Sequence, residues 1–177
     1  MKERIKLQYM WSKNKKIGSR FISWGTTFLE PNINLKDTPS HIAILVNERW
    51  VVESTLENGV RLVPFSWWKK HNTIVKQIPC WDNTRELKEI LKVVEEHFAL
   101  KYDWLGIIYF AWRVLLYILF KTKIPKENRF EHNNKYFCCE VIGKLTGENY
   151  EMTSPVTMMV NLEKSYLAYL KDLKEQQ

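Results

Sequence analysis

A cysteine late in the chain stands where a helix is expected to begin. Cys138 follows two aromatic residues, and the residues after it have a near-helical apolar spacing that ends at a glycine: Val141, Ile142, Leu145 and Gly147. Backbone N–H groups in the first turn of a helix have no intrahelical acceptor, and the helix dipole stabilises a thiolate there. The same groups can bind a developing oxyanion. The pattern predicts a nucleophilic Cys138; the alternative is a structural cysteine, since free thiols are common in cores.

A nucleophilic thiol needs a base, and the base needs an acceptor that orients it. His41 opens the clearest strand of the sequence directly after a loop, where its side chain can reach a cleft. Glu53 interrupts the apolar run of the returning strand. The other histidines lie in polar surroundings and are expected to be solvated: His71, His97 and His132. We therefore predict a triad of Cys138, His41 and Glu53, against the alternatives of a structural histidine and a solvent-facing glutamate.

The register of two strands decides whether this triad can form. Side chains alternate between the faces of a strand, so His41 and Glu53 share a face only if paired residue numbers sum to an even value. An odd number of connecting residues, such as 47–49, satisfies this condition. A two-residue turn at 47–48 would place the two side chains on opposite faces.

The elements that must position these residues indicate an α+β fold. Strands are expected at 5–11, 40–46, 50–55, 60–65 and 73–79, closely spaced and therefore antiparallel. Helices are expected at 87–98, 105–120, from 138 onward and at 161–177, with a short helix or an extended segment at 17–24. We predict a single domain over 1–177: an antiparallel, barrel-like sheet with helices packed on one side.

Composition narrows the class of protein. The chain has 177 residues, 45% of them hydrophobic and 27% charged, which fits one folded domain. Its three cysteines are odd in number and two are adjacent, so neither a disulfide scaffold nor a structural zinc site is expected. Residues 1–16 are charged and contain no apolar stretch typical of a secretory signal, so a reducing, cytoplasmic location is expected.

The net charge of +7 has two interpretations. One is a basic, solvated surface, and the other is an anionic partner. No arginine-rich run or nucleic-acid motif accompanies the charge, so no nucleic acid is expected as partner.

The segment 105–120 is the most apolar of the chain, but it contains Arg113 and is shorter than the roughly 20 residues of a membrane span. It is either a buried helix or a helix that lies on an anionic membrane surface. In the second case its aromatic residues would lie at headgroup level, with lysines beyond: Trp104, Tyr109, Trp112, Tyr117, Lys121 and Lys123.

Several short motifs, taken in order, resemble a known family. They are Ile-Ser-Trp-Gly-Thr at 22–26, Pro-Ser-His-Ile-Ala-Ile at 39–44, Val-Glu-Ser-Thr at 52–55 with Gly-Val at 59–60, Lys-Tyr-Asp-Trp at 101–104, and Phe-Cys-Cys-Glu at 137–140. Together they are similar to the circularly permuted papain-like hydrolases of the NlpC superfamily. That superfamily includes the bacterial and phage YiiX-like group, with the lecithin:retinol acyltransferases as relatives.

The resemblance implies a permuted papain-like fold and a role for each residue of the triad. His41 matches the base, Glu53 matches the acid that orients it, and Cys138 matches the nucleophile, two residues before Glu140. The family usually has serine or threonine at the position of Cys139. No metal or organic cofactor is implied.

These observations favour a cysteine hydrolase or acyltransferase that forms a thioester on Cys138. The substrate class stays open between peptide amides, cell-wall peptides, and the ester or thioester bonds of lipids. Two alternatives also stay open. One is a non-catalytic binding module of the same fold, and the other is a membrane-surface, lipid-acting acyltransferase that uses the apolar 105–120 helix.

Overall fold

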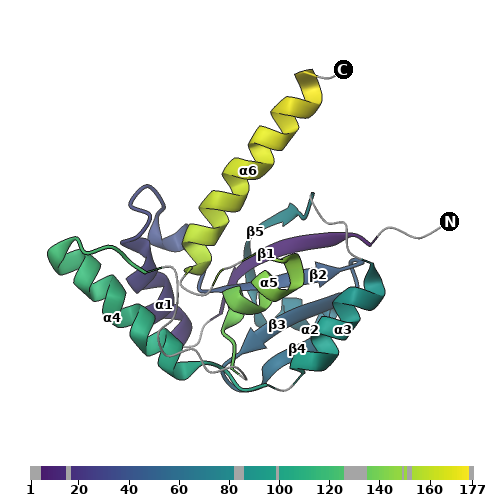
Figure 1. Cartoon of the computed structure of the whole chain (residues 1–177), viewed down its shortest axis with the longest axis horizontal. Coiled ribbons are helices and arrows are strands. Elements are labelled where there is room, and N and C mark those ends of the chain that lie inside the picture. The colour runs from purple at the N-terminus through teal and green to yellow at the C-terminus, as the bar shows by residue number, and fades with distance from the viewer. Residues whose placement is uncertain are drawn as a thin grey trace.

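The β segments come together in one antiparallel sheet. The computed structural model describes residues 5–14, 17–81, 86–98, 100–125, 135–148, 150 and 153–175. Within them the sheet has five strands: β1 (Leu7–Lys13), β2 (His41–Val46), β3 (Trp50–Thr55), β4 (Gly59–Pro64) and β5 (Thr73–Pro79). Their spatial order is β4-β3-β2-β1-β5, so β2 is the central strand (Figure 1).

Helices occupy both faces of this sheet. The described elements are α1 (Ile17–Thr27), the short 3-10 helix η1 (Leu35–Asp37), α2 (Phe65–His71), α3 (Leu87–His97), α4 (Trp104–Phe120), α5 (Cys138–Thr146) and α6 (Pro155–Glu175). In Figure 1, α5 crosses in front of the sheet and α2 lies behind it. The helices α1 and α4 lie together at one end, and α6 projects away from the rest. None of the helices in the described part of the chain is long and apolar enough to cross a bilayer.

The two faces of β2 explain its continuous apolar sequence. Ile42, Ile44 and Val46 belong to the larger core, together with residues of α3, α5 and α6. Ala43 and Leu45 belong to a smaller core on the opposite face, which includes Trp68 of α2. A strand that is buried on both faces loses the alternation of apolar and polar residues.

The sheet differs from expectation in two respects. It is open and not barrel-like, because β4 and β5 are its edges and do not pair with each other within the described residues. The helix α2, which the sequence analysis did not predict, contacts β3, β4 and β5 and covers the face between the two edges. Helices therefore pack on both sides of the sheet, with α3, α5 and α6 on one and α2 on the other.

The predicted strands and the long helices are confirmed, with shifted ends. The first strand covers Leu7–Lys13 instead of 5–11, and 17–24 is helical and extends to Thr27. The last helix begins at Pro155, six residues before its expected start at 161. Ser154 precedes this helix and its hydroxyl accepts the Thr157 N–H at 3.1 Å, while proline is well tolerated in the first helical position.

Candidate active site

The turn between β2 and β3 sets the register that the triad requires. Val46 pairs with Trp50 and Ile44 with Val52, so the connection consists of residues 47–49. Asn47 and Glu48 take the left-handed backbone conformation, with φ of 48° and 59°. The paired residue numbers sum to an even value, and the predicted common face for His41 and Glu53 is confirmed.

His41 and Glu53 are in direct contact at the start of β2. The His41 Nε2 lies 2.8 Å from the Glu53 Oε2, and the two side chains are 13% and 1% exposed. The backbone before His41 is fixed to two elements, since the Ser40 N–H donates to the Ser12 carbonyl of β1 at 3.0 Å. The Ser40 hydroxyl is also hydrogen bonded to the Ser19 hydroxyl of α1. These bonds fix the start of β2, from which the imidazole projects.

Glu53 is a buried carboxylate with several donors. Arg61, its partner across β3 and β4, donates from Nε at 2.8 Å and from Nη2 at 2.6 Å to Oε1. Trp68 donates its indole N–H to Oε2 at 2.7 Å. Burial would raise the pKa of Glu53, but the hydrogen bond and charge of His41, with Trp68 and Arg61, lower the pKa to about 2. The carboxylate is therefore charged throughout the physiological range.

Cys138 lies against the other side of the imidazole. Because Nε2 faces Glu53, Nδ1 is the nitrogen left for the hydrogen bond between His41 and the Cys138 thiol. Burial would lower the pKa of His41, but the hydrogen bonds and charges of Cys138 and Glu53 raise that pKa to about 10. The result is an imidazolium between two anions.

The sulfur of Cys138 is correspondingly stabilised as a thiolate. A hydrogen bond from the Cys139 thiol lowers the pKa of Cys138 well below its usual value, burial opposes this, and the hydrogen bond and charge of His41 lower it further. The Ile42 backbone N–H also donates to the sulfur. Burial and the neighbouring Cys138 anion raise the pKa of Cys139 well above its usual value. The two neighbouring cysteines thus differ in charge. Cys138 is the thiolate, and the Cys139 thiol donates a hydrogen bond to it.

Local sequence explains why Cys138 begins α5. The Glu140 side chain, 5% exposed, accepts the Phe137 N–H at 2.9 Å and so satisfies one donor at the helix start. Gly147, with φ of 87°, ends the helix. Cys138 is the first helical residue, and its own N–H has no intrahelical acceptor. It is available as an oxyanion donor.

Two further contacts bring this segment to the sheet. The Ser54 hydroxyl, next to Glu53, donates to the Tyr136 carbonyl at 2.7 Å. The Tyr136 N–H donates to the Lys101 carbonyl at 3.1 Å. Residues 101–103 therefore lie beside the start of α5. Burial, followed by the negative charge of Cys138, raises the pKa of Tyr102 well above its usual value, so its phenol stays protonated near the sulfur.

The remaining histidines do not enter this site within the described residues. His71 is exposed and its Nδ1 contacts the Trp67 carbonyl at 2.8 Å. His97 is half-buried, contrary to the expectation that it is solvated, because it packs edge-on against the Tyr136 ring. His132 lies outside the described residues. Among the described side chains, no group of histidine, cysteine and acidic residues is arranged to hold a metal ion.

Arg61, Trp68 and Tyr102 are site residues that the sequence analysis missed. Only Arg61 had a usable signal, because a basic residue opposite Glu53 follows from the β3–β4 register once the turn at Gly59 is placed. Trp68 comes from the unpredicted helix α2. A cavity of about 500 Å³ lies away from these residues, at the opposite end of β2, between α3 and residues 46–50.

Comparison with known proteins gives no relative for this arrangement. No protein-family model matches the chain, and neither a curated protein nor a solved structure is significantly similar to it.

Proposed function

We propose that the protein is a cysteine-dependent hydrolase or acyltransferase with Cys138 as nucleophile. The observation that carries this proposal is the position of His41 between the Glu53 carboxylate and the Cys138 sulfur. An imidazolium between two stabilised anions is the resting state of a thiolate–imidazolium nucleophile. The order of the motifs along the chain further supports a relationship to the permuted papain-like hydrolases of the NlpC superfamily.

The proposed reaction begins with attack of the Cys138 thiolate on a substrate carbonyl carbon. A C–S bond forms, and the carbonyl electron pair moves to the oxygen, where the Cys138 backbone N–H stabilises the charge. His41 then gives its Nδ1 proton to the leaving nitrogen, oxygen or sulfur as that bond breaks, which leaves a thioester on Cys138. Glu53 stays ionised throughout and holds the imidazole through Nε2.

The second half of the reaction restores the thiolate. Neutral His41 takes a proton from water, or from an acceptor alcohol or amine, as its oxygen or nitrogen attacks the thioester. The C–S bond breaks, the acyl product leaves, and His41 is again the protonated partner of the Cys138 anion. Water as acceptor gives hydrolysis, and an alcohol or amine gives acyl transfer.

Alkylation of the native thiols tests this proposal. Cys138 is 3% exposed, so a small reagent such as iodoacetamide is required. We expect Cys138 to react near neutral pH much faster than Cys80 or Cys139, with the adducts mapped by mass spectrometry. His41→Gln should abolish the rapid phase, whereas His97→Gln, a matched change at a half-buried histidine outside the site, should leave it intact.

Slow labelling of all three cysteines in the native protein would contradict the proposal and favour a non-catalytic binding module. If Cys138 reacts rapidly, profiling with peptide amides, esters and thioesters defines the leaving group. Release of acyl product that is lost in Cys138→Ala would complete the case for catalysis.

A further inference from the structure

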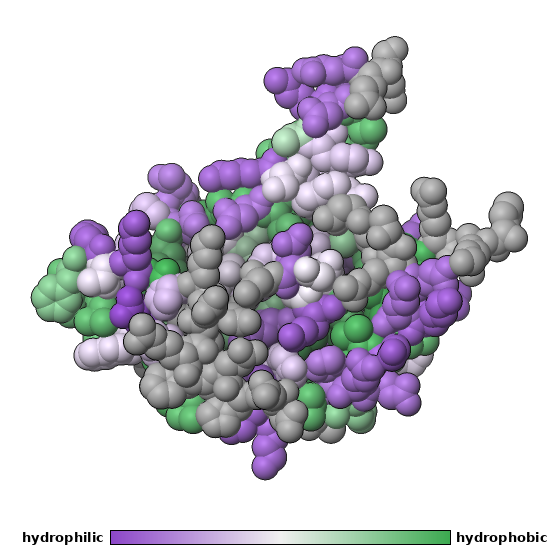
Figure 2. Space-filling view, in the orientation of Figure 1, coloured by the Kyte–Doolittle hydropathy of each residue, from purple (hydrophilic) through white to green (hydrophobic). Residues whose placement is uncertain are grey.

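One face of α4 is apolar and uncovered in this structure. Its residues follow helical spacing and are between 44% and 69% exposed: Leu105, Ile108, Trp112, Leu115, Leu119 and Phe120. The neighbouring helix α1, which contacts α4, adds two more exposed rings: Trp24 of α1 and Phe28, the residue after this helix, lie edge-on at 5.4 Å and are 57% and 45% exposed. We call these eight residues the α4 face. Figure 2 shows apolar surface at the end of the molecule where α4 lies.

The helix α4 has almost no polar side to turn toward water. Arg113 is the one charged residue among its 17 residues. On the side that packs on the protein, Gly106 and Val114 are buried. The apolar residues on the outer side do not contribute to the core. A helix that is apolar all round is stable only when a non-aqueous environment also covers its outer side.

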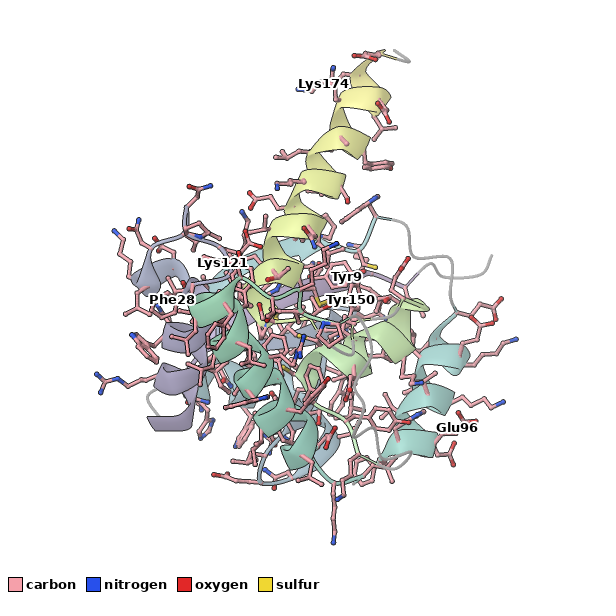
Figure 3. The ribbon with its side chains drawn as sticks, turned by 60° about the vertical axis from the view of Figure 1, so that its left-hand side comes forward. Tyr9, Phe28, Glu96, Lys121, Tyr150 and Lys174 are labelled. Atoms are coloured by element: carbon pink, nitrogen blue, oxygen red, sulfur yellow. The ribbon has the colours of Figure 1, made fainter. Side chains whose placement is uncertain are left out.

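Local hydrogen bonds order both ends of α4. The side chain of Asp103, 1% exposed, accepts the Gly106 N–H at 2.9 Å and caps the helix start. At the other end the Arg113 Nη2 donates to the Lys123 carbonyl at 2.7 Å. The helix also contacts α1 along its inner side. Figure 3 shows Phe28, just after α1, and Lys121, just after α4, on the same end of the molecule.

All charges on these two helices are positive. Arg20 and Arg113 are the only charged residues of α1 and α4, and neither helix contains aspartate or glutamate. Lys121 and Lys123 follow α4 and are exposed, as is Lys101 just before it. The chain as a whole carries +7. Exposed lysines thus lie before the start of α4 and after its end, and lysines beside an apolar helix are typical of surfaces that bind anionic headgroups.

We propose that the α4 face docks on the surface of an anionic lipid bilayer, with its apolar side chains in the headgroup boundary and the lysines that flank α4 on the lipid phosphates. Trp24 and Trp112 are suited to this depth, because indole rings prefer the membrane–water boundary. The helix would lie along the surface, since its other side is packed on the protein.

A second copy of this chain is a weaker occupant for the same face. The spacing of Leu105, Ile108, Trp112, Leu115 and Leu119 could form a two-helix seam, but the positions that flank such a seam are also apolar, among them Tyr109, Ala111, Leu116 and Ile118. Coiled-coil pairs place charged residues there to fix partner and register. Two copies would also bring like charges together, whereas an anionic bilayer brings opposite ones.

Docking through α4 would also place the candidate active site close to the bilayer. Residues 101–103, which precede α4, run beside the start of α5, where the Lys101 carbonyl accepts the Tyr136 N–H. This consequence rests on the proposed hydrolase function and favours a lipid-like substrate, but the docking itself does not depend on the thiol.

Flotation with vesicles tests the docking. Full-length protein should float with vesicles of phosphatidylcholine and phosphatidylglycerol, bind vesicles of phosphatidylcholine alone far less, and be released by high salt. Ile108→Gln/Leu119→Gln should weaken binding about 100-fold, at roughly tenfold for each large, half-exposed apolar side chain removed from the bilayer. The matched control is Leu167→Gln/Leu173→Gln on α6, which removes two exposed leucines of another surface and should bind as the unmodified chain does.

Several outcomes would overturn the proposal. These are no flotation with phosphatidylglycerol vesicles, equal loss of binding in both double variants, or a dimer in sedimentation that only the α4 double variant dissociates. Alkylation of Cys138 is a measurement that is independent of flotation. The Cys138→Ala variant should still float with the vesicles, and the α4 double variant should still be alkylated at Cys138. A failure of docking is thereby separated from a failure of the catalytic proposal.

Discussion

Replacing Glu53 with glutamine should remove a defined, pH-dependent part of the stability of the protein. The folded pKa of Glu53 is about 2, against 4.5 for an unperturbed glutamate. A lowered pKa means that the folded state favours the charged carboxylate. The stabilisation is complete above pH 4.5 and is lost as the pH falls toward 2. At about 1.4 kcal/mol for each pH unit between the two pKa values, it amounts to about 3 kcal/mol.

This difference can be isolated by urea unfolding followed through tryptophan fluorescence. We compare Cys138→Ala with Cys138→Ala/Glu53→Gln, so that the thiolate does not titrate in the same range. The pKa of about 10 for His41 depends on Cys138 and Glu53, so the difference between the two variants also contains the change in His41 protonation that follows when Glu53 is replaced. We expect the two variants to differ by about 3 kcal/mol at pH 6 and to converge near pH 2.

A difference below about 1 kcal/mol, or one that does not change with pH, would refute the role assigned to Glu53. The first result would mean that His41, Arg61 and Trp68 do not stabilise its charge. The second would mean that glutamine disturbs packing instead of electrostatics. Arg61→Met in the same background provides a check, since it removes two of the hydrogen bonds to the carboxylate but leaves those of His41 and Trp68, and should give a smaller change of the same sign.

Two further predictions concern Cys139 and the glycines. Cys139→Ser should keep a donor to the Cys138 sulfur and preserve the rate of Cys138 alkylation near pH 6. Cys139→Ala removes this donor and so raises the pKa of Cys138, which should slow alkylation at pH 6 but not at pH 9. Equal alkylation rates for the two variants at pH 6 would argue against the donor. Gly143→Ala should destabilise the protein by about 1–3 kcal/mol in urea unfolding, because a Cβ there would lie 2.4 Å from the Glu148 carbonyl oxygen. Gly25→Ala, where a Cβ meets nothing within 4 Å, should instead stabilise α1 by about 0.5–1 kcal/mol, and a similar loss in both variants would contradict the close approach at Gly143.

The contact between His41 and Glu53 could be predicted because strand geometry is local. An apolar run, a short turn and a second apolar run define a hairpin, and the parity of its register decides which side chains share a face. The same reasoning placed Cys138 at a helix start, since a short apolar periodicity ending at Gly147 has few other interpretations. These features depend on neighbours within a few residues, or on one hairpin.

The rest of the site depends on packing between distant segments. The helix α2 has only seven residues, too few for a clear helical periodicity. Its sequence therefore did not predict that Trp68 would donate to the Glu53 carboxylate. The position of β1 between β2 and β5 could not be predicted either, because the pairing of β1 with β5 joins the first strand of the chain to the last. The expected closed sheet was wrong for a related reason, since α2 fills the face that closure would have enclosed.

The candidate active site and the α4 face are linked by one short segment. Asp103 caps α4, while two residues earlier the Lys101 carbonyl accepts the Tyr136 N–H just before α5. Both ends of residues 101–103 are therefore fixed, one to the exposed helix and the other to the strand–helix junction that presents Cys138. Taken together, the two proposals predict an enzyme whose Cys138 attacks an acyl substrate held in a membrane, close to the start of α4.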